Sequence, residues 1–353
     1  MGEKVLMKGN EAIAEAAIRA GCRYFFGYPI TPQSELPAYL ARKFPEVGGT
    51  FVQAESEVAA SNMIYGAAGA GARVLTSSSS PGISLKAEGI SYIAGAELPA
   101  VIINIMRGGP GLGSIQPSQA DYFQATKGMA HGDFRLTVLA PSTVQEAVDL
   151  TMEAFEIADR YRNPVLIVGD GIIGQMMEPV EFKEAVDPDE LPKKEWATDG
   201  AKGREPNVIN SLALEPQDLE DHNMKLKAKY DKMKEEEVRY EELYTDDADI
   251  IIVAYGTTAR ISSRAIEMAR KEGYKVGMIR PITLFPFPTD IISETADRVD
   301  DFLAVEMSTG QMVEDVRLAV NGKKPVHFYG RTGGVVPSPE EIVNKIKEIG
   351  GEK

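Results

Sequence analysis

The sequence predicts an α/β protein: a mostly parallel sheet with helices on both faces, followed by a second and smaller α/β domain. Short apolar runs alternate with helical segments up to about residue 180, and a second alternating block begins at about residue 249. A densely charged stretch separates the two blocks. We therefore divide the 353 residues into a first domain over 1–180, a connector over 181–248 and a second domain over 249–353.

In the first block, the apolar runs predict strands near 24–26, 50–53, 74–77, 101–105, 136–139 and 165–168. Helical patterns fill the intervals at 11–20, 33–41, 57–69, 84–96, 118–129 and 144–161. A strand that is followed by a helix and a further strand is typical of parallel pairing, so we expect a mostly parallel sheet.

The connector and the second block follow. Residues 187–192 and 200–206 are typical of loops, and 216–244 predict an exposed helix that either embraces a partner subunit or forms a solvated linker. Beyond the connector, strands are predicted at 250–255, 275–279, 302–305 and 326–329, with helices at 259–272, 289–297 and 311–320.

Composition excludes several function classes. The 38 basic and 53 acidic residues give a net charge of −15, so binding to nucleic acid or to an anionic membrane is not expected. No apolar run approaches the roughly 20 residues that span a bilayer. The first residues do not resemble a signal peptide, and we expect a cytoplasmic protein.

Cysteine and histidine usage limits the redox and metal chemistry of the chain. Cys22 is the only cysteine, so the chain cannot form an internal disulfide or hold an iron–sulfur cluster by itself. We expect Cys22 to pack in the core. The three histidines are too scattered to suggest a zinc site, and Gly169-Asp170-Gly171 lacks the downstream asparagine segment of a metal and diphosphate motif. We expect no metal site.

The turn Gly27-Tyr28-Pro29-Ile30-Thr31-Pro32 is the first candidate binding segment. It follows a predicted strand, and parallel sheets place ligands beyond the carboxyl ends of their strands. The two prolines restrict the backbone around Thr31, so its hydroxyl can be presented at low entropic cost. Thr31 is equally suited to cap the following helix, and the two roles are compatible.

Glu55 and Glu57 follow the next strand and open a helix. Acidic residues in a first turn commonly complement the helix dipole. The helix continues with small and apolar residues on several faces, so a carboxylate at its edge can be desolvated and its pKa raised toward a role in proton transfer.

Two further segments follow strands. Ser77-Ser78-Ser79-Ser80 either binds an anion or caps the next helix. Arg107 precedes the glycine-rich loop 108–113 and is suited to bind a substrate carboxylate. The alternative is that Arg107 forms an ion pair at the protein surface.

Taken together, these segments resemble the α subunit of the 2-oxoacid:ferredoxin oxidoreductases, thiamine diphosphate enzymes that are divided over several chains. The resemblance covers nearly the whole chain. It rests on residues 9–12, 27–32, 53–60, 77–85, 106–113, 119–121, 131–133 and 174–179, and in the second domain on 255–260, 280–288 and 305–311. The last three segments are similar to the carboxyl-terminal domain of transketolase-like proteins.

The resemblance implies a role for each candidate residue. The first domain becomes a pyrimidine-binding domain, in which Glu57 is the glutamate that hydrogen-bonds the aminopyrimidine and promotes formation of the ylid nucleophile. Pro29 and Ile30 contact the cofactor. Thr31 and Arg107 contact the substrate, with the guanidinium holding the 2-oxoacid carboxylate.

The same resemblance implies partners. A β subunit supplies the diphosphate site, Mg²⁺ and a proximal [4Fe-4S] cluster, and γ and ferredoxin-like δ subunits complete the complex. Coenzyme A accepts the acyl group and ferredoxin the electrons, so the isolated chain is expected to be inactive.

The loop 111–117 has no basic residue that could pair with a second substrate carboxylate. The chain therefore resembles the 2-oxoisovalerate branch of the family more than the 2-oxoglutarate branch. Alternatives are the same chemistry on 2-oxoglutarate, a subunit of a non-oxidative thiamine decarboxylase, and a non-catalytic scaffold.

Overall fold

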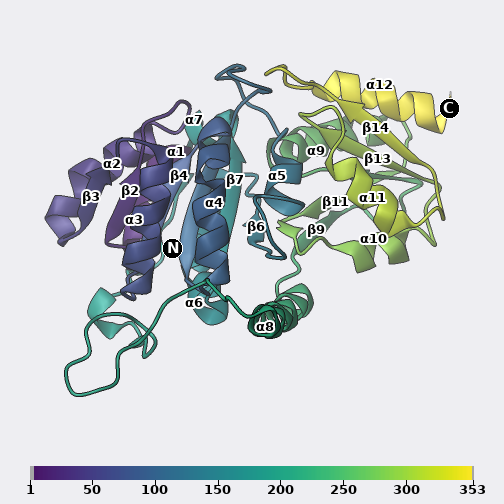
Figure 1. Cartoon of the computed structure of the whole chain (residues 1–353). Helices are drawn as coiled ribbons and strands as arrows, with labels where there is room; N and C mark the ends of the chain where they lie inside the picture. Colours follow the sequence, from purple (N-terminus) through teal and green to yellow (C-terminus); the bar gives the residue numbers. More distant parts are fainter. Residues whose placement is uncertain (1–3, 352–353) are drawn as a thin grey trace.

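Two sheets stand side by side in the computed structural model, which describes residues 4–351 (Figure 1). The larger sheet has seven strands in the order β12-β6-β7-β5-β4-β2-β3. Their bounds are β2 Tyr24–Gly27, β3 Thr50–Gln53, β4 Val74–Ser78, β5 Ala100–Met106, β6 Thr137–Leu139, β7 Pro164–Asp170 and β12 Thr283–Phe285. All pairings except that of β12 are parallel, so the predicted α/β class is confirmed.

The middle of this sheet forms the core of the first domain. Every residue of β4, β5 and β7 is buried, and the near-continuous apolar runs of β5 and β7 explain why helices must cover both faces. The helices are α1 Gly9–Arg19, α2 Glu35–Lys43, α3 Glu57–Gly69, α4 Pro81–Gly95, α5 Tyr122–Thr126, α6 Val144–Tyr161 and α7 Gly171–Gln175, with a 3₁₀ turn at Phe44–Val47. α3 packs against α4, and α1 packs against both α2 and α6.

The predicted helices 57–69 and 144–161 match α3 and α6 in full. Each begins at a hydroxyl cap: Ser56 accepts a hydrogen bond from the Ala59 amide, and Thr143 accepts one from the Glu146 amide. Of the predicted helix 118–129, only Tyr122–Thr126 is helical. A two-stranded ribbon, β1 Val5–Lys8 with β8 Met177–Val180, was not predicted as a pair.

The second sheet has five strands in the order β14-β13-β10-β11-β9. Their bounds are β9 Tyr240–Leu243, β10 Ile250–Val253, β11 Val276–Pro281, β13 Asp301–Glu306 and β14 Val326–Gly330. The helices are α9 Gly256–Lys271, α10 Thr289–Thr295, α11 Met312–Val320 and α12 Pro339–Gly350. β9 is antiparallel to β11, and the other pairings are parallel.

Two short strands, β9 and β12, do not pair within the segment of the chain to which the sequence assigns them. β9 falls within the predicted connector yet completes the second sheet, whereas β12 follows residue 249 and pairs with β6 of the first sheet. The predicted helix over 216–244 therefore ends early, as α8 at Pro216–Glu236. The boundaries at 180 and 248 stay a prediction.

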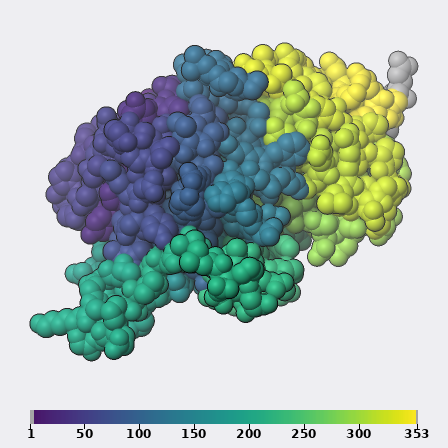
Figure 2. Space-filling view, in the orientation of Figure 1, coloured from purple at the N-terminus to yellow at the C-terminus, as the bar shows by residue number. Residues whose placement is uncertain are grey.

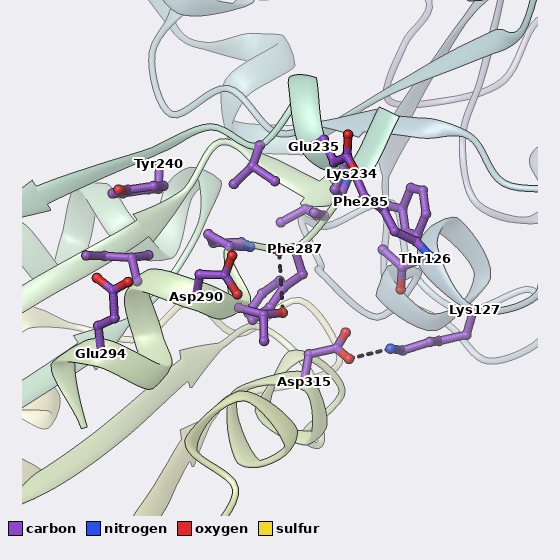
Figure 3. Close-up of a pocket in the computed structure, with 16 residues that line it drawn as sticks. Thr126, Lys127, Lys234, Glu235, Tyr240, Phe285, Phe287, Asp290, Glu294 and Asp315 are labelled. Atoms are coloured by element: carbon purple, nitrogen blue, oxygen red, sulfur yellow. Dashed lines mark hydrogen bonds and ion pairs between the residues drawn. The ribbon is translucent and has the colours of Figure 1, made fainter. Parts of the chain in front are cut away.

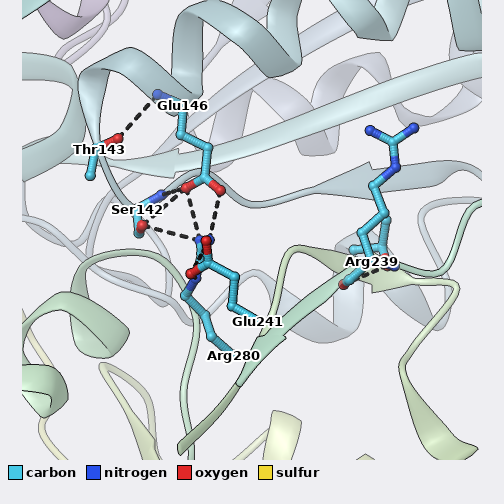
Figure 4. Close-up of polar contacts among 7 residues, drawn as sticks. Ser142, Thr143, Glu146, Arg239, Glu241 and Arg280 are labelled. Carbon is cyan, nitrogen blue, oxygen red and sulfur yellow. Dashed lines mark hydrogen bonds and ion pairs between the residues drawn. The ribbon is translucent and has the colours of Figure 1, made fainter. Parts of the chain in front are cut away.

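Buried polar groups hold the two blocks together. Gln119 is fully buried; its Nε2 donates to the Tyr255 carbonyl, and its Oε1 accepts from the Met307 amide. Figure 4 shows a second junction, where Arg280 from β11 donates to both carboxylate oxygens of Glu146 at the start of α6, at 2.8 and 2.7 Å. Arg280 is only 3% exposed, so this bidentate pair is largely shielded from solvent.

The connector runs along one side of both blocks and is the band of teal and green that extends at the lower left of Figure 2. It carries a 3₁₀ turn at Pro188–Glu190 and then α8, whose Lys229 pairs with Glu97 of the first domain at 3.3 Å. The Arg162 guanidinium lies over the ring of Trp196, 4.4 Å from the ring centroid. Among the described residues, no helix has the length and apolar character needed to cross a bilayer.

Candidate functional site

The candidate residues gather at the carboxyl edge of the large sheet. Thr31, Glu57, Ser80 and Arg107 come after β2, β3, β4 and β5, and these four strands pair in parallel. The carboxyl ends of parallel strands meet at one edge. Segments far apart in the sequence are therefore brought into one site.

The turn at Thr31 is open to solvent. Thr31 and Pro29 are exposed and Ile30 is half-buried. α2 begins at Glu35 with Ser34 in the capping position, so the predicted capping role of Thr31 is wrong. The helix starts later because the backbone at Pro32 continues the turn, which leaves the Thr31 hydroxyl available to a ligand.

Arg107 lies directly beside this turn. Its Nη1 donates to the Thr31 carbonyl at 3.0 Å and its Nη2 to the Leu112 carbonyl at 3.4 Å, whereas its buried Nε has no partner in the part of the chain that the structure describes. The residue is 9% exposed and forms no ion pair within residues 4–351, so the surface ion pair considered from the sequence is wrong. A guanidinium with unused donors and no carboxylate partner is suited to bind an anion.

Ser80 links β4 to β5 through a buried network that the sequence did not predict. Its hydroxyl donates to Asp121 at 2.6 Å and accepts from the Arg107 amide at 3.0 Å. Asn104 accepts from the Ser80 amide and donates to Asp121. Ser80 makes no capping bond to α4, so capping by this residue is wrong. Burial raises the pKa of Asp121, although the hydrogen bonds from Ser80 and Asn104 oppose that rise.

The structure separates the two glutamates at the start of α3. Glu55 is exposed and accepts a hydrogen bond from Ser56, whereas Glu57 is 5% exposed. The Glu57 carboxylate accepts no hydrogen bond from the part of the chain that the structure describes. Burial without a partner is costly for a carboxylate, which favours Glu57 as the functional residue of the two.

Gly82, in the first turn of α4, forms a cradle for this carboxylate. A Cβ at Gly82 would lie 2.0 Å from Ser78 Oγ and 2.6 Å from Glu57 Oε1, so any side chain there would displace both oxygens. Ser78 Oγ, Ser79 Oγ and Lys86 Nζ are buried nearby in sequence and have no hydrogen-bond partner among the described residues. Buried polar groups without partners, of which Ser78 Oγ lies at Gly82 itself, indicate a site that a ligand completes.

A cavity of about 830 Å³ opens beside Thr31. Its lining is mostly apolar or uncharged and comes from both blocks: Thr31, Pro32, Ser34, Glu35, Ile115, Gln116, Pro117, Gly171, Ile172, Gln175, Met176, Gly334 and Val336. Burial raises the pKa of Glu35, but hydrogen bonds from its own amide, Asn10, Gln175 and Lys8 outweigh that effect and lower it. The one charged side chain of the lining is therefore an anion at neutral pH.

A second cavity, of about 630 Å³, lies where α5, α8, α10 and α11 approach one another (Figure 3). Its charged groups include Lys127 and Asp315, which already form an ion pair. None of the predicted site residues lines it. This cavity is therefore separate from the candidate site.

Two other sequence predictions concern single residues. Asp170 of the Gly-Asp-Gly segment is buried and accepts hydrogen bonds from the Ile172 and Ile173 amides, so it caps α7. Cys22 is fully buried as expected, and burial raises the pKa of its thiol to about 12. Within residues 4–351, no cluster of three or more His, Cys, Asp or Glu side chains could hold a metal ion.

The fold is a parallel-sheet domain with a buried glutamate at its carboxyl edge, joined to a smaller α/β domain. The family described as "Pyruvate flavodoxin/ferredoxin oxidoreductase, thiamine diP-bdg" matches residues 15–245, and "Pyruvate:ferredoxin oxidoreductase core domain II" matches residues 248–342. The chain therefore belongs to the 2-oxoacid:ferredoxin oxidoreductase family, and the predicted resemblance is confirmed.

Relatives with curated names extend over the whole chain. The ketoisovalerate oxidoreductase subunit VorB of Methanothermobacter thermautotrophicus is 53% identical over 98% of both chains. The 2-oxoglutarate synthase subunit KorA of the same organism is 36% identical, covering 99% of this chain and 100% of its own.

Solved structures agree on the fold. A 2-oxoglutarate:ferredoxin oxidoreductase from Magnetococcus marinus, with 2-oxoglutarate, coenzyme A and succinyl-CoA bound, superposes with a TM-score of 0.86 at 25% identity, over 98% of this chain and 65% of that one. A split-gene transketolase has a TM-score of 0.61 at 16% identity over 99% and 98% of the two chains, which bears on the fold alone.

Proposed function

We propose that this chain is the α subunit of a multi-subunit enzyme that oxidatively decarboxylates 2-oxoisovalerate with coenzyme A, giving an acyl-CoA, CO₂ and reduced ferredoxin. The observation that carries the proposal is the buried, unpartnered Glu57 carboxylate over Gly82, at the sheet edge that also presents Thr31 and Arg107. The relatives named as ketoisovalerate oxidoreductase subunits support the choice of substrate.

The residues present fit thiamine diphosphate. At Gly82, Glu57 Oε1 and Ser78 Oγ have no hydrogen-bond partner among the described residues. Both oxygens can therefore bond to a ring that carries hydrogen-bond donors and acceptors. When bound, the cofactor supplies a carbon nucleophile and an electron sink. Glu57 would hold the proton at the aminopyrimidine ring nitrogen, with Pro29 and Ile30 packing against the ring.

The substrate is placed by different residues. We assign the 2-oxoacid carboxylate to the Arg107 guanidinium and its keto oxygen to the Thr31 hydroxyl. Ile115, Ile172 and Val336 in the adjoining cavity suit a branched apolar side chain. The anionic Glu35 in the same lining disfavours the second carboxylate of 2-oxoglutarate, so that alternative is the weaker one despite relatives that carry that name.

The partner subunits would cover the exposed side of α3 and α4. Val58 and Met63 on α3 and Leu85 and Tyr92 on α4 are large side chains with 46, 37, 54 and 39% exposure, on helices whose other faces are also apolar. A helix that is apolar all round is normally buried. We assign a β subunit with the diphosphate and Mg²⁺ site to this surface, and the [4Fe-4S] clusters to the β and δ subunits of a cytoplasmic αβγδ complex.

The test is the reconstituted complex with Glu57→Gln. Viologen or ferredoxin reduction should fall at least ~10²-fold, the scale of a lost proton-transfer group. Glu55→Gln is the matched control, because the neighbouring carboxylate is exposed, and its rate should stay within about twofold of wild type.

Near-wild-type rates in Glu57→Gln would instead support the scaffold alternative. Assays of the wild-type complex with 2-oxoisovalerate, 2-oxoglutarate and pyruvate should give the highest kcat/KM for 2-oxoisovalerate. Release of free aldehyde without ferredoxin reduction would favour a non-oxidative decarboxylase.

A further inference from the structure

Residues 207–214 of the connector form an exposed apolar segment that the proposed active site does not use. The segment is neither helix nor strand and lies between the exposed loop 200–206 and α8. Its Val208, Leu212 and Leu214 side chains are 81, 68 and 83% exposed. Apolar side chains gathered in this way on a surface mark an interaction site.

The segment is extended, with one face on the protein and the other face free. Asn207, Ile209 and Ala213 are half-buried, whereas the even-numbered residues from 208 to 214 are all exposed, and of the odd-numbered ones only Ser211 is. A period of two residues is that of a β-strand. On the inner face, Ile209 packs against the apolar cluster to which α3 and α4 contribute.

The backbone of the segment is free to pair with another strand. The Leu212 amide donates to the Asn210 side chain, and the Leu212 carbonyl accepts from the same side chain. No other backbone group of residues 208–214 makes a hydrogen bond within the described part of the chain. An extended segment of this kind can be added to the sheet of a partner, where main-chain hydrogen bonds give affinity and alternate side chains give specificity.

Contacts hold the segment at both ends. Asn207 Nδ2 donates to the carbonyls of Glu195 and Ala197, at 2.6 and 2.9 Å. Beyond the segment, His222 Nε2 of α8 is hydrogen-bonded to the carbonyl of Gly95, the last residue of α4, at 2.7 Å. A segment that is already held in place loses less conformational entropy when a partner binds.

The free face of the segment continues the exposed apolar surface of α3 and α4. The chain passes the lower end of α4 in Figure 1 on its way to α8. Leu212 lines a cavity of about 360 Å³ together with Tyr65 of α3 and Tyr92 of α4. Tyr92 belongs to the surface that is assigned above to a partner subunit. A chain that covers α3 and α4 therefore also reaches the segment, and the cavity can take an apolar side chain from it.

Charge disfavours a second copy of this chain as the partner. Antiparallel pairing of two copies through Val208, Leu212 and Leu214 would bring Glu205 of one copy opposite or diagonal to Glu215 of the other. Both glutamates are exposed and form no ion pair among residues 4–351. Like charges in such positions destabilise a strand pair. The flanking carboxylates instead favour a different chain that carries basic side chains beside an apolar strand.

We propose that residues 207–214 dock as an extended strand on the subunit that covers α3 and α4, a chain other than this one with an apolar strand edge flanked by basic side chains. The proposal rests on the function proposed above, because that function requires a second subunit over these helices to complete the cofactor site. Ile209 and Ser211 lie near Gly69 and Gly95 at the ends of α3 and α4, whereas the cofactor cradle lies at their first turns. Docking therefore adds affinity without a contact to the reacting groups.

Photocrosslinking identifies the occupant. p-Benzoylphenylalanine placed at Leu212, and separately at Leu85 on α4, should crosslink the same partner chain in the purified multi-subunit complex, as read by mass spectrometry. A crosslink from position 212 to a second copy of this chain, to a subunit other than the one that position 85 reaches, or to no chain would overturn the proposal.

Hydrogen exchange tests the backbone. The amides of residues 208–214 should exchange at least about 10-fold more slowly in the complex than in this chain alone. Exchange in the neighbouring loop 200–206 should change by less than about twofold. Equal exchange of residues 208–214 in the two samples would contradict docking as a strand.

Substitution separates docking from catalysis. Leu212→Asp should weaken association with the partner at least about 10-fold, measured by mass photometry over a dilution series. Its kcat at saturating partner concentration should stay within about twofold of wild type. Leu318→Asp on α11 is the matched control, because its side chain is 72% exposed and the same charge is added, and its affinity should change by less than about twofold. Unchanged affinity in Leu212→Asp would overturn the proposal.

Charge reversal distinguishes the two kinds of partner. Glu205→Lys should weaken the complex about 3-fold at low salt and less at high salt, because the carboxylate faces basic groups. Tighter association of this chain with itself in Glu205→Lys would instead identify a second copy as the occupant and overturn the proposal.

Failure of the proposed function is recognised separately. If Leu212→Asp loses affinity while Glu57→Gln retains full activity, the docking segment stands and the catalytic role of Glu57 falls. If Leu212→Asp keeps full affinity while Glu57→Gln is inactive, the proposed function stands and the docking segment falls.

Discussion

At the scale of single residues, burial and hydrogen-bond partners distinguish between the roles that the sequence leaves open. Glu55 and Glu57 are equivalent as acidic residues in a first turn, but burial distinguishes them. Likewise, Thr31 and Ser80 were both suited to cap helices, and neither does so. Capping propensity is local, whereas the partners that replaced it, such as Asp121 for Ser80, lie on another strand or loop.

Gly82 offers a prediction at this scale. Gly82→Ala should weaken thiamine diphosphate binding by the complex at least about 10-fold, because the new methyl group would meet Ser78 Oγ and Glu57 Oε1 well inside contact distance. Calorimetric titration of the cofactor measures the effect. Gly66→Ala on α3 is the control, since nothing lies within 4 Å of its Cβ position, and alanine favours a helix by about 1 kcal/mol. Equal affinities in the two variants would contradict the role of the cradle.

At the scale of elements, the strands and helices with strong local patterns were predicted well and the others were not. β5 and β7 are near-continuous apolar runs, and α3 and α6 each begin at a hydroxyl cap, and the predictions of these four elements hold. β9 is Tyr-Glu-Glu-Leu, whose charges favour a helix in isolation, and β12 has only three residues within a proline-rich stretch. Both are strands because a distant strand pairs with them, which no local pattern encodes.

Glu306 gives a prediction for one element. It is fully buried at the end of β13 and accepts hydrogen bonds from the amides of Gln311, Met312 and Val313, which begin α11. Glu306→Ala should lower the free energy of unfolding by ~3 kcal/mol, because these donors lose a charged acceptor in a dry site. Urea unfolding measures the change. Glu314→Ala, on the exposed side of the same turn, should cost less than ~0.5 kcal/mol, and a similar loss in both would argue against the cap.

At the scale of the whole molecule, buried contacts join the two blocks into one structural unit. Gln119 and the Arg280–Glu146 pair join them through buried polar contacts, and the Thr31 cavity takes Gly334 and Val336 from the second block. The sequence predicted two domains and a family, but it could not predict this junction, since its partners are more than 100 residues apart. Because the Thr31 cavity takes residues from both blocks, the site depends on the junction between them.

A cut in the connector tests this unity. A protease site placed in the exposed loop 200–206 should give two fragments that elute together in size-exclusion chromatography and unfold in a single thermal transition. The uncut chain with the same insertion is the control. Fragments that separate without denaturant would show that the blocks associate only weakly.

The exchange of β9 and β12 also bears on how such a chain can be rearranged during evolution. A gene split at residue 248 would send β9 away with the first block and β12 away with the second, leaving β11 and β6 each with an uncovered edge. Uncovered edges invite pairing with foreign strands and aggregation. Recombination that reuses either half is therefore expected to be viable only when it also replaces the missing strand, so these two blocks should be inherited together.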